Sequence, residues 1–196
     1  VSYVGNNVSL FEKKLTQYTR SKYAVATSSG TSALHLILKY LKIGKNDEVL
    51  MPTSTYVATA AAVIYCNSTP NFVDIENENL GICPNKLKSY LERISKKKGK
   101  SCYNKKTGKK IKALIVVHLY GFPSKILEIK KVCKKFNIKI IEDAAEALGS
   151  FYKKKHLGTF SEAGILSFNG NKTITCGGGG AIITNNKKMA KKLKHL

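Results

Sequence analysis

The sequence predicts an α/β protein in which helices cover both faces of a mostly parallel sheet. Segments with helical spacing alternate with short apolar segments along the chain, and this alternation is typical of βαβ units. One short segment, Ala113–Val117, is apolar throughout, the pattern of a strand buried on both faces. At 196 residues the chain is long enough for one domain with a sizeable core.

The first five elements alternate between helix and strand. Leu10–Tyr18 has apolar residues at helical spacing, and Tyr23–Thr27 is a short β-branched and aromatic run. Ser32–Leu41 returns to helical spacing. Glu48–Met51 is a strand that ends at a proline, and Thr55–Tyr65 is an alanine-rich helix.

The middle of the chain contains a break in this pattern. Asn71–Val73 is a short strand and Asn85–Ile94 a helix, but Ser95–Lys112 is a polar, lysine-rich insert with a turn-like Asn-Lys-Lys-Thr-Gly sequence. We expect this insert to be an exposed hairpin or a mobile loop. The buried strand Ala113–Val117 follows it.

Four further elements follow the buried strand. Ile126–Phe136 is helical, and Ile138–Ile141, Ala163–Phe168 and Ala181–Thr184 are apolar strands. Apolar residues then continue at helical spacing to Leu196 with no C-cap signal, and the first residue is not methionine. We therefore expect a piece of a longer protein, truncated at both ends.

The formal charge of +22 raises the alternative of a basic nucleic-acid-binding or regulatory protein on the same fold. Of the 34 basic residues only Arg20 and Arg93 are arginine, the residue preferred for bidentate phosphate and base contacts. The lysines are also spread over most of the chain. We therefore attribute the positive charge to a lysine-rich composition of the whole chain, and we expect no nucleic-acid partner.

The cysteines and the apolar runs indicate a location. The five cysteines are odd in number and contain no Cys-x-x-Cys pair, so neither a disulfide framework nor a metal site is expected. A reducing cytoplasm fits this pattern best. No apolar run reaches membrane-spanning length, so no membrane partner is expected.

Ligands bind at the carboxyl ends of the strands in sheets of this kind. After the first strand comes Ser28-Ser29-Gly30-Thr31-Ser32, which places small residues at the start of a helix. Unpaired amides and the helix dipole favour an anion such as a phosphate there, although an ordinary N-cap explains the same residues equally well. The absence of Walker A and Gly-x-Gly-x-x-Gly patterns argues against a different nucleotide-binding α/β enzyme.

Aromatic and ionisable residues follow three other strands. Tyr56 could lie against a planar ring, although core packing is the commoner role of a tyrosine. A carboxylate at Glu142 or Asp143 could hold a pyridinium nitrogen protonated, bind a metal or cap a helix, and strand alternation does not decide between the two residues. His118 is best explained as a hydrogen-bonded structural histidine, with a role in the site as the second reading.

Lys172 is the most informative residue of the sequence. It follows the Ala163–Phe168 strand and precedes four consecutive glycines. A lysine fixed at the mouth of a sheet suits Schiff-base chemistry with an aldehyde cofactor. Because 32 of the 34 basic residues are lysines, residue type alone says little, and the case depends on the neighbouring segments.

These segments resemble the DegT/StrS family of pyridoxal-phosphate-dependent nucleotide-sugar aminotransferases. The order and spacing of five motifs match over essentially the whole chain: Ser29-Gly30-Thr31-Ser32-Ala33-Leu34, Pro52-Thr53-Ser54-Thr55-Tyr56, Val117-His118-Leu119-Tyr120-Gly121, Glu142-Asp143-Ala144-Ala145-Glu146 and Ser167-Phe168-Asn169-Gly170-Asn171-Lys172. The resemblance implies the large domain of an aspartate-aminotransferase-like (type I) fold, with a mostly parallel seven-stranded sheet. Residues 1–196 would form this cofactor-binding domain, and the C-terminal small domain would be missing.

The resemblance also implies roles for single residues. Lys172 would be the catalytic Schiff-base lysine and proton shuttle, and Asp143 the partner of the pyridine nitrogen. Glu146 stands where many members have glutamine, near the phenolic oxygen of the cofactor. Tyr56 stands where an aromatic residue stacks on the ring. The implied phosphate ligands are Gly30, Thr31, Ser32 and Ser167.

The resemblance finally implies a reaction and its partners. Relatives that dehydrate sugars replace the lysine with histidine, so Lys172 implies transamination, with glutamate as donor and a nucleotide-activated deoxy sugar as acceptor, for cell-surface glycan synthesis. The glycine run and the Ser95–Lys112 insert resemble the branch that acts on UDP-linked 4-keto-6-deoxy-N-acetylhexosamines, on routes to bacillosamine or legionaminic acid. Gly178 departs from a glutamate that many members have. The family implies a homodimer with shared active sites, and basic loops could help to hold the substrate diphosphate.

Overall fold

The computed structural model describes residues 6–196. The first residues, on which the expectation of a truncated N-terminus rests, lie outside this range. In chain order the elements are α1 (Asn6–Thr19), β1 (Tyr23–Thr27), α2 (Gly30–Tyr40), β2 (Asp47–Pro52), α3 (Val57–Tyr65), β3 (Thr69–Val73), α4 (Pro84–Ile94), β4 (Ser95–Lys98), β5 (Ser101–Asn104), β6 (Lys110–Val117), the 3-10 helix η1 (Leu119–Gly121), α5 (Ile126–Phe136), β7 (Lys139–Asp143), β8 (Phe151–Tyr152), β9 (Lys155–His156), β10 (Ala163–Ser167), β11 (Gly180–Thr184) and α6 (Lys187–Leu193).

Seven strands form the body of the sheet in the order β1-β11-β10-β7-β6-β2-β3. The pairs from β10 to β3 are parallel, whereas β11 is antiparallel to both of its neighbours, β1 and β10. The predicted mostly parallel, seven-stranded sheet is therefore confirmed. The hairpin of β4 and β5 joins the same sheet through β6.

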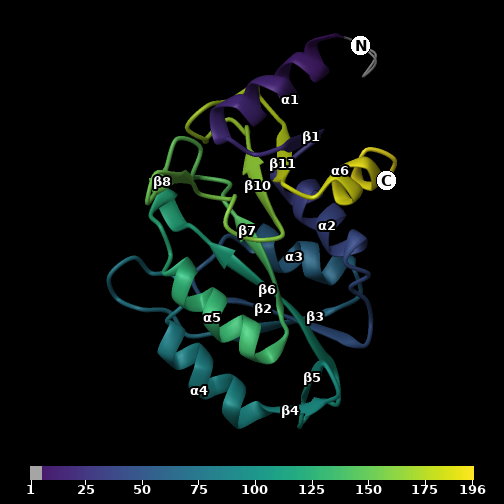
Figure 1. Cartoon of the computed structure of the whole chain (residues 1–196), viewed down its shortest axis with the longest axis vertical. Coiled ribbons are helices and arrows are strands. Elements are labelled where there is room, and N and C mark those ends of the chain that lie inside the picture. The colour runs from purple at the N-terminus through teal and green to yellow at the C-terminus, as the bar shows by residue number, and fades with distance from the viewer. Residues whose placement is uncertain (1–5) are drawn as a thin grey trace.

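Helices cover the sheet on both faces, as the sequence predicts (Figure 1). The core on one face contains buried residues of α4 and α5, including Leu87 and Ile129. The core on the other face contains buried residues of α2, α3 and α6, including Leu34, Val63 and Met189. Within residues 6–196, no helix combines the length and the apolar character that crossing a membrane requires.

The observed boundaries differ from the predicted ones for local physical reasons. Helix α2 begins at Gly30 because Ser29 caps it: the hydroxyl of Ser29 accepts a hydrogen bond from the amide of Ser32 at 3.0 Å. Strand β6 begins at Lys110, three residues before the predicted start, because Lys110 and Ile111 pair with the beginning of β2. Backbone pairing thus extends a strand into residues whose side chains are polar.

The Ser95–Lys112 segment is more tightly attached than the exposed hairpin or mobile loop that we expected. Cys102 and Asn104 are buried. The buried carboxylate of Glu48, at the start of β2, accepts hydrogen bonds from the side-chain amides of Asn104 at 3.0 Å and Asn71 at 2.8 Å, and from the hydroxyl of Thr107. These bonds fasten the hairpin to the edge of the sheet where the parallel strands begin.

Candidate active site

A cavity of about 590 Å³ lies where five strands give way to loops, at the carboxyl ends of β1, β2, β6, β7 and β10. Seven of the eight predicted site residues line it: Gly30, Thr31, Tyr56, Asp143, Glu146, Ser167 and Lys172. The eighth, Ser32, is not among the lining residues. Its hydroxyl lies 3.1 Å from that of Ser28 and 3.0 Å from that of Ser29. Parallel strands thus bring segments from most of the chain to one place.

The beginning of α2 forms an anion-binding cradle at one side of this cavity. The amides of Ser32 and Ala33 are occupied, because they donate to the hydroxyl and the carbonyl oxygen of Ser29. Among the described residues, the amides of Gly30 and Thr31 donate to no backbone or side-chain acceptor. Free amides at a helix start attract an anion. The N-cap and phosphate readings of this segment are therefore compatible.

Close backbone packing against β11 fixes the position of the cradle. A Cβ atom placed on Gly180 would lie 2.3 Å from the carbonyl carbon of Ser29 and 2.6 Å from the amide nitrogen of Gly30. A Cβ atom on Gly30 would lie 3.1 Å from the Cβ of Ser167. The two glycines allow β11, β10 and the start of α2 to approach one another.

Asp143, the last residue of β7, supplies a buried carboxylate to the cavity. Burial raises the pKa of this carboxyl, while hydrogen bonds from the hydroxyl of Thr59 at 2.9 Å and the amide of Ala145 at 3.2 Å oppose the rise. A carboxylate in this setting can stabilise a positively charged partner that enters the cavity. The structure decides between the two acidic residues, because Asp143 lines the cavity and Glu142 does not.

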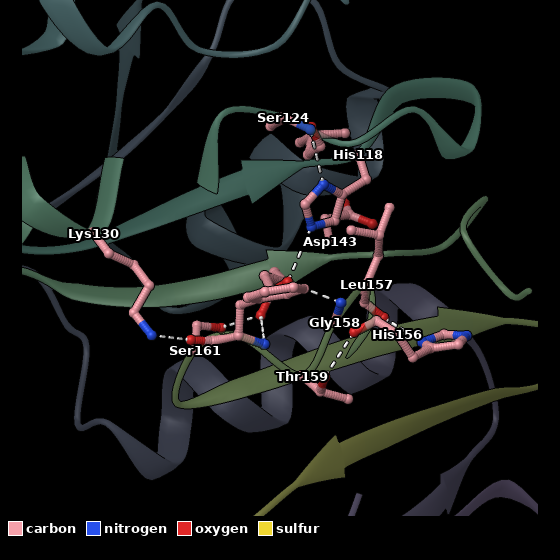
Figure 2. Close-up of polar contacts among 12 residues, drawn as sticks. His118, Ser124, Lys130, Asp143, His156, Leu157, Gly158, Thr159 and Ser161 are labelled. Atoms are coloured by element: carbon pink, nitrogen blue, oxygen red, sulfur yellow. Dashed lines mark hydrogen bonds and ion pairs between the residues drawn. The ribbon is translucent and has the colours of Figure 1, made fainter. Parts of the chain in front are cut away.

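Glu142 belongs to a separate buried network (Figure 2). Its carboxylate accepts hydrogen bonds from Nε2 of His118 at 3.0 Å, the amide of Gly158 at 2.8 Å, and the amide of Phe160 at 2.7 Å. The hydroxyl of Ser161 also donates to it, at 2.8 Å. Burial alone would raise the pKa of Glu142, but these bonds and the nearby imidazole hold it below its usual value.

His118 is the structural histidine that the sequence predicts. It is buried, and its Nδ1 accepts a hydrogen bond from the amide of Ser124 at 3.2 Å, which leaves the proton on Nε2 to be donated to Glu142 (Figure 2). Its backbone amide donates to the carbonyl oxygen of Asp143 at 3.0 Å. His118 also lines the cavity, so it connects the Glu142 network to the site.

Lys172 lies in the loop between β10 and β11 and faces a carboxylate. Its Nζ is 3.2 Å from Oε1 of Glu146, and only 14% of its side chain is exposed. Oε2 of Glu146 accepts a hydrogen bond at 2.9 Å from the amide of Tyr120, whose backbone is left-handed with a φ of 52°. The loop closes through a hydrogen bond from the amide of Phe168 to the carbonyl oxygen of Gly179 at 2.9 Å. Lys172 is therefore held at the cavity wall and is not a solvated surface charge.

Tyr56 lies at the N-cap position of α3, at the mouth of the cavity. It is 75% exposed, so the core packing that we considered the commoner role is wrong for this residue. Its ring is free to contact a ligand. Tyr120, which is 74% exposed, lines the same cavity.

Thr55 and Thr59 are two residues of this site to which the sequence assigned no role. Both line the cavity, and Thr59 is the direct hydrogen-bond donor to Asp143. Thr55 precedes the N-cap residue Tyr56, and Thr59 lies in the first turn of α3. Two hydroxyl residues four positions apart at the start of a predicted helix are the signal that could have indicated them.

The arrangement combines an anion cradle, a buried carboxylate and a partly buried lysine around one cavity. This donor set suits a phosphorylated, nitrogen-containing aromatic aldehyde, because each of its three functional groups meets a group of complementary chemistry.

The comparisons with known proteins agree with this assignment. Residues 1–196 match the family described as the DegT/DnrJ/EryC1/StrS aminotransferase family. The chain is 40% identical over 195 residues to a GDP-perosamine synthase of Escherichia coli O157:H7, covering 100% of this chain and 49% of the relative. It is 38% identical over 196 residues to the putative pyridoxal phosphate-dependent aminotransferase EpsN of Bacillus subtilis, covering 100% and 48%.

A solved structure shows the same fold. A DegT DnrJ EryC1 StrS aminotransferase from Brucella abortus superposes with a TM-score of 0.88 at 30% identity, over 97% of this chain and 49% of that one. The chain thus spans about half the length of the curated relatives it matches.

Proposed function

Because this chain belongs to the DegT/DnrJ/EryC1/StrS aminotransferase family, we propose that the whole protein is a pyridoxal-phosphate-dependent aminotransferase that aminates a keto group of a nucleotide-activated deoxy sugar. Glutamate is the proposed amino donor. The observation that supports this most directly is the meeting of Lys172, Asp143 and the start of α2 in one cavity.

The residues present fit pyridoxal phosphate. The amides of Gly30 and Thr31 and the hydroxyl of Ser167 would hold its phosphate, Asp143 its ring nitrogen, and Lys172 its carbonyl carbon. Tyr56 would cover the ring. When bound, the cofactor supplies an electrophilic carbon and a ring that accepts electrons.

The chain's own groups then perform three tasks. The buried carboxylate of Asp143 would stabilise a positive charge that enters the cavity. The amine of Lys172, once free and uncharged, would take a proton from the Cα atom of the donor in one half-reaction and would deliver a proton to the keto carbon of the acceptor in the other. The carboxylate of Glu146 holds the ammonium form of Lys172 at 3.2 Å between these steps.

We propose a UDP-linked 4-keto-6-deoxy-N-acetylhexosamine as the acceptor, on the basis of the glycine run and the lysine-rich insert. A GDP-linked sugar is the second candidate, because a relative that is 40% identical is named a GDP-perosamine synthase. Comparing the initial rates of amination of the UDP-linked and the GDP-linked sugar distinguishes these acceptors.

We also propose that two subunits complete each site, in the cytoplasm, where five unpaired cysteines stay reduced. Exposed aromatic residues support the dimer: Tyr56 and Tyr120 line the cavity and are 75% and 74% exposed, and Phe122, two residues after Tyr120, is 62% exposed. A surface of this kind is typical of a contact with another chain.

The decisive experiment uses the full-length protein. It is incubated with pyridoxal phosphate, reduced with borohydride, digested and analysed by mass spectrometry. A phosphopyridoxyl group on the peptide that contains Lys172, absent from Lys172→Ala, is the expected result. A folded, dimeric protein with no such label would overturn the proposal.

A further inference from the structure

The hydroxyl groups of Thr55 and Thr59 form a chain that ends on Asp143. The hydroxyl of Thr55 donates to that of Thr59 at 2.8 Å, and the hydroxyl of Thr59 donates to Oδ2 of Asp143 at 2.9 Å. Each hydroxyl has one proton to give. Because each hydroxyl gives its proton to the next group, the chain of donors runs from Thr55 through Thr59 to Asp143.

Thr59 differs in this respect from other buried threonines of the chain. The hydroxyls of Thr19 and Thr159 donate to backbone carbonyl oxygens, those of Leu15 and His156. Such bonds serve local structure. Thr59 is 1% exposed and lies in the first turn of α3. Its hydroxyl nevertheless donates to the carboxylate of Asp143, which belongs to β7.

The hydrogen bond from Thr59 opposes the effect of burial on Asp143. Burial raises the pKa of Asp143, and the Thr59 hydroxyl is the strongest of the contacts that lower it. The other ionisable groups that line the same cavity are Lys172, His118, Glu146, Tyr56 and Tyr120. Lys172 lowers the pKa of Asp143 through its charge, and the first turn of α3 contributes the hydroxyl of Thr59 but no charged group.

We propose that Thr59, supported by Thr55, is a positioning residue that keeps Asp143 ionised and in one orientation for a protonated ring nitrogen. Thr59 bonds to one oxygen and the amide of Ala145 to the other. A carboxylate has about four lone-pair positions, so both oxygens can still accept a further donor. The inference rests on the proposed function, because it gives Asp143 a cationic partner.

Three variants of the full-length protein and one control test this role. Thr59→Val removes the hydroxyl and keeps the shape, Thr59→Ser keeps the hydroxyl, and Thr55→Val removes the first donor. Thr19→Val is the matched control, because it removes an equally buried hydroxyl that donates to a backbone carbonyl.

The first measurement is the titration of Asp143 in the cofactor-free protein. It follows the ¹³C carboxyl signal that disappears in Asp143→Asn. Loss of a hydrogen bond to the charged form should move the midpoint up by about one pH unit in Thr59→Val, and by less in Thr55→Val. Thr59→Ser and Thr19→Val should titrate like the wild type.

The second measurement is the dissociation constant of pyridoxal phosphate as a function of pH. Affinity falls when Asp143 is protonated, so in Thr59→Val the fall should begin at a higher pH and reach about a tenfold loss where the wild type still binds. A Thr59→Val protein that matches Thr19→Val in both measurements would overturn the inference. If the wild type takes no label at Lys172, the proposed function fails instead, and the carboxyl titration still decides whether Thr59 controls Asp143.

Discussion

Lys172 is distinguished from the other lysines by its surroundings. Its side chain is mostly buried, its Nζ contacts Glu146, and the backbone of its loop is closed by hydrogen bonds between Phe168 and the residues before β11. The sequence predicts this residue because it follows a strand and precedes the glycine run. The contact with Glu146 needs the folded chain, since that residue comes from the segment after β7.

Replacing Lys172 tests its role directly. In the full-length protein, Lys172→Ala should lower the turnover number by about a hundredfold to ten-thousandfold, the usual effect of removing a positioned proton-transfer group. The variant should still retain part of its bound cofactor during dialysis, because the phosphate cradle and Asp143 remain. Lys139→Ala, which removes an exposed partner of Glu162, is the control. Wild-type turnover in Lys172→Ala would show that the assignment is wrong.

His156 makes a prediction about stability. Burial lowers its pKa, its Nε2 accepts a hydrogen bond from the amide of Gly149 at 3.1 Å, and its ring packs against those of Tyr18 and Phe151. As pH falls below about 6.5, the unfolded chain binds a proton at this histidine before the folded chain does. The free energy of unfolding should therefore decrease as pH falls through this value.

The check is urea unfolding at several pH values between about pH 7 and about pH 5. His156→Gln should lose this part of the pH dependence, and His195→Gln, which changes an exposed histidine, should keep it. An unchanged pH dependence in His156→Gln would contradict the prediction.

Single polar contacts of the site could be predicted only in part. Asp143 ends β7 and Lys172 lies in the loop that follows β10, at the carboxyl ends of strands, where the topology of parallel sheets places ligands. Thr59 stands inside an alanine-rich helix, and its neighbour Asp143 is far away in the sequence. Periodicity indicates which face of α3 is buried, but not that a carboxylate of β7 lies against it.

At the scale of elements, β11 and the start of α2 act as one unit. Gly180 is packed against the backbone of Ser29 and Gly30. Gly180→Ala should lower the free energy of unfolding by about 1–3 kcal/mol, as overpacking does, and weaken cofactor binding because the cradle must move. Gly44→Ala is the matched control, since nothing lies within 4 Å of a Cβ placed there and Gly44 does not line the cavity. Urea unfolding and cofactor titration measure both effects, and equal behaviour of the two variants would contradict the prediction.

Element types could be predicted from the sequence, but the direction of β11 could not. Its apolar pattern is that of a buried strand, and this pattern is the same for parallel and antiparallel neighbours. The early start of β6 is hidden for a related reason: its first residues, Lys110, Ile111 and Lys112, belong to the lysine-rich insert, while the pairing of Lys110 and Ile111 with β2 depends only on backbone groups.

At the scale of the whole molecule, the basic hairpin and the cavity lie at opposite ends of the parallel strands. The hairpin joins β6 near Lys110, and the cavity lies beyond Val117 at the other end of the same strand. Seven residues of strand separate the two by roughly 23 Å. Within one subunit, the basic hairpin therefore lies too far from the cavity to be one of the basic loops that could help to hold a substrate diphosphate.

Neutralising the hairpin tests this separation. The triple substitution Lys96→Gln, Lys97→Gln and Lys98→Gln should leave kcat/KM for the nucleotide sugar within about twofold of the wild type, since exposed substitutions away from a site have small effects. Steady-state kinetics at constant ionic strength provides the measurement. A large rise in KM would indicate that the hairpin of one subunit reaches the site of another.

The antiparallel strand β11 also dictates when the site can form during folding. In the sheet, β1 lies next to β11, which is synthesised near the end of this chain. Strand β1 therefore gains this sheet partner only after the chain has been made as far as β11, and contacts between such distant segments form slowly because a long loop has to close. The phosphate cradle follows β1 directly, so a nascent chain acquires it late. A molecule can therefore bind the cofactor at this cradle only after β11 has taken its place between β1 and β10.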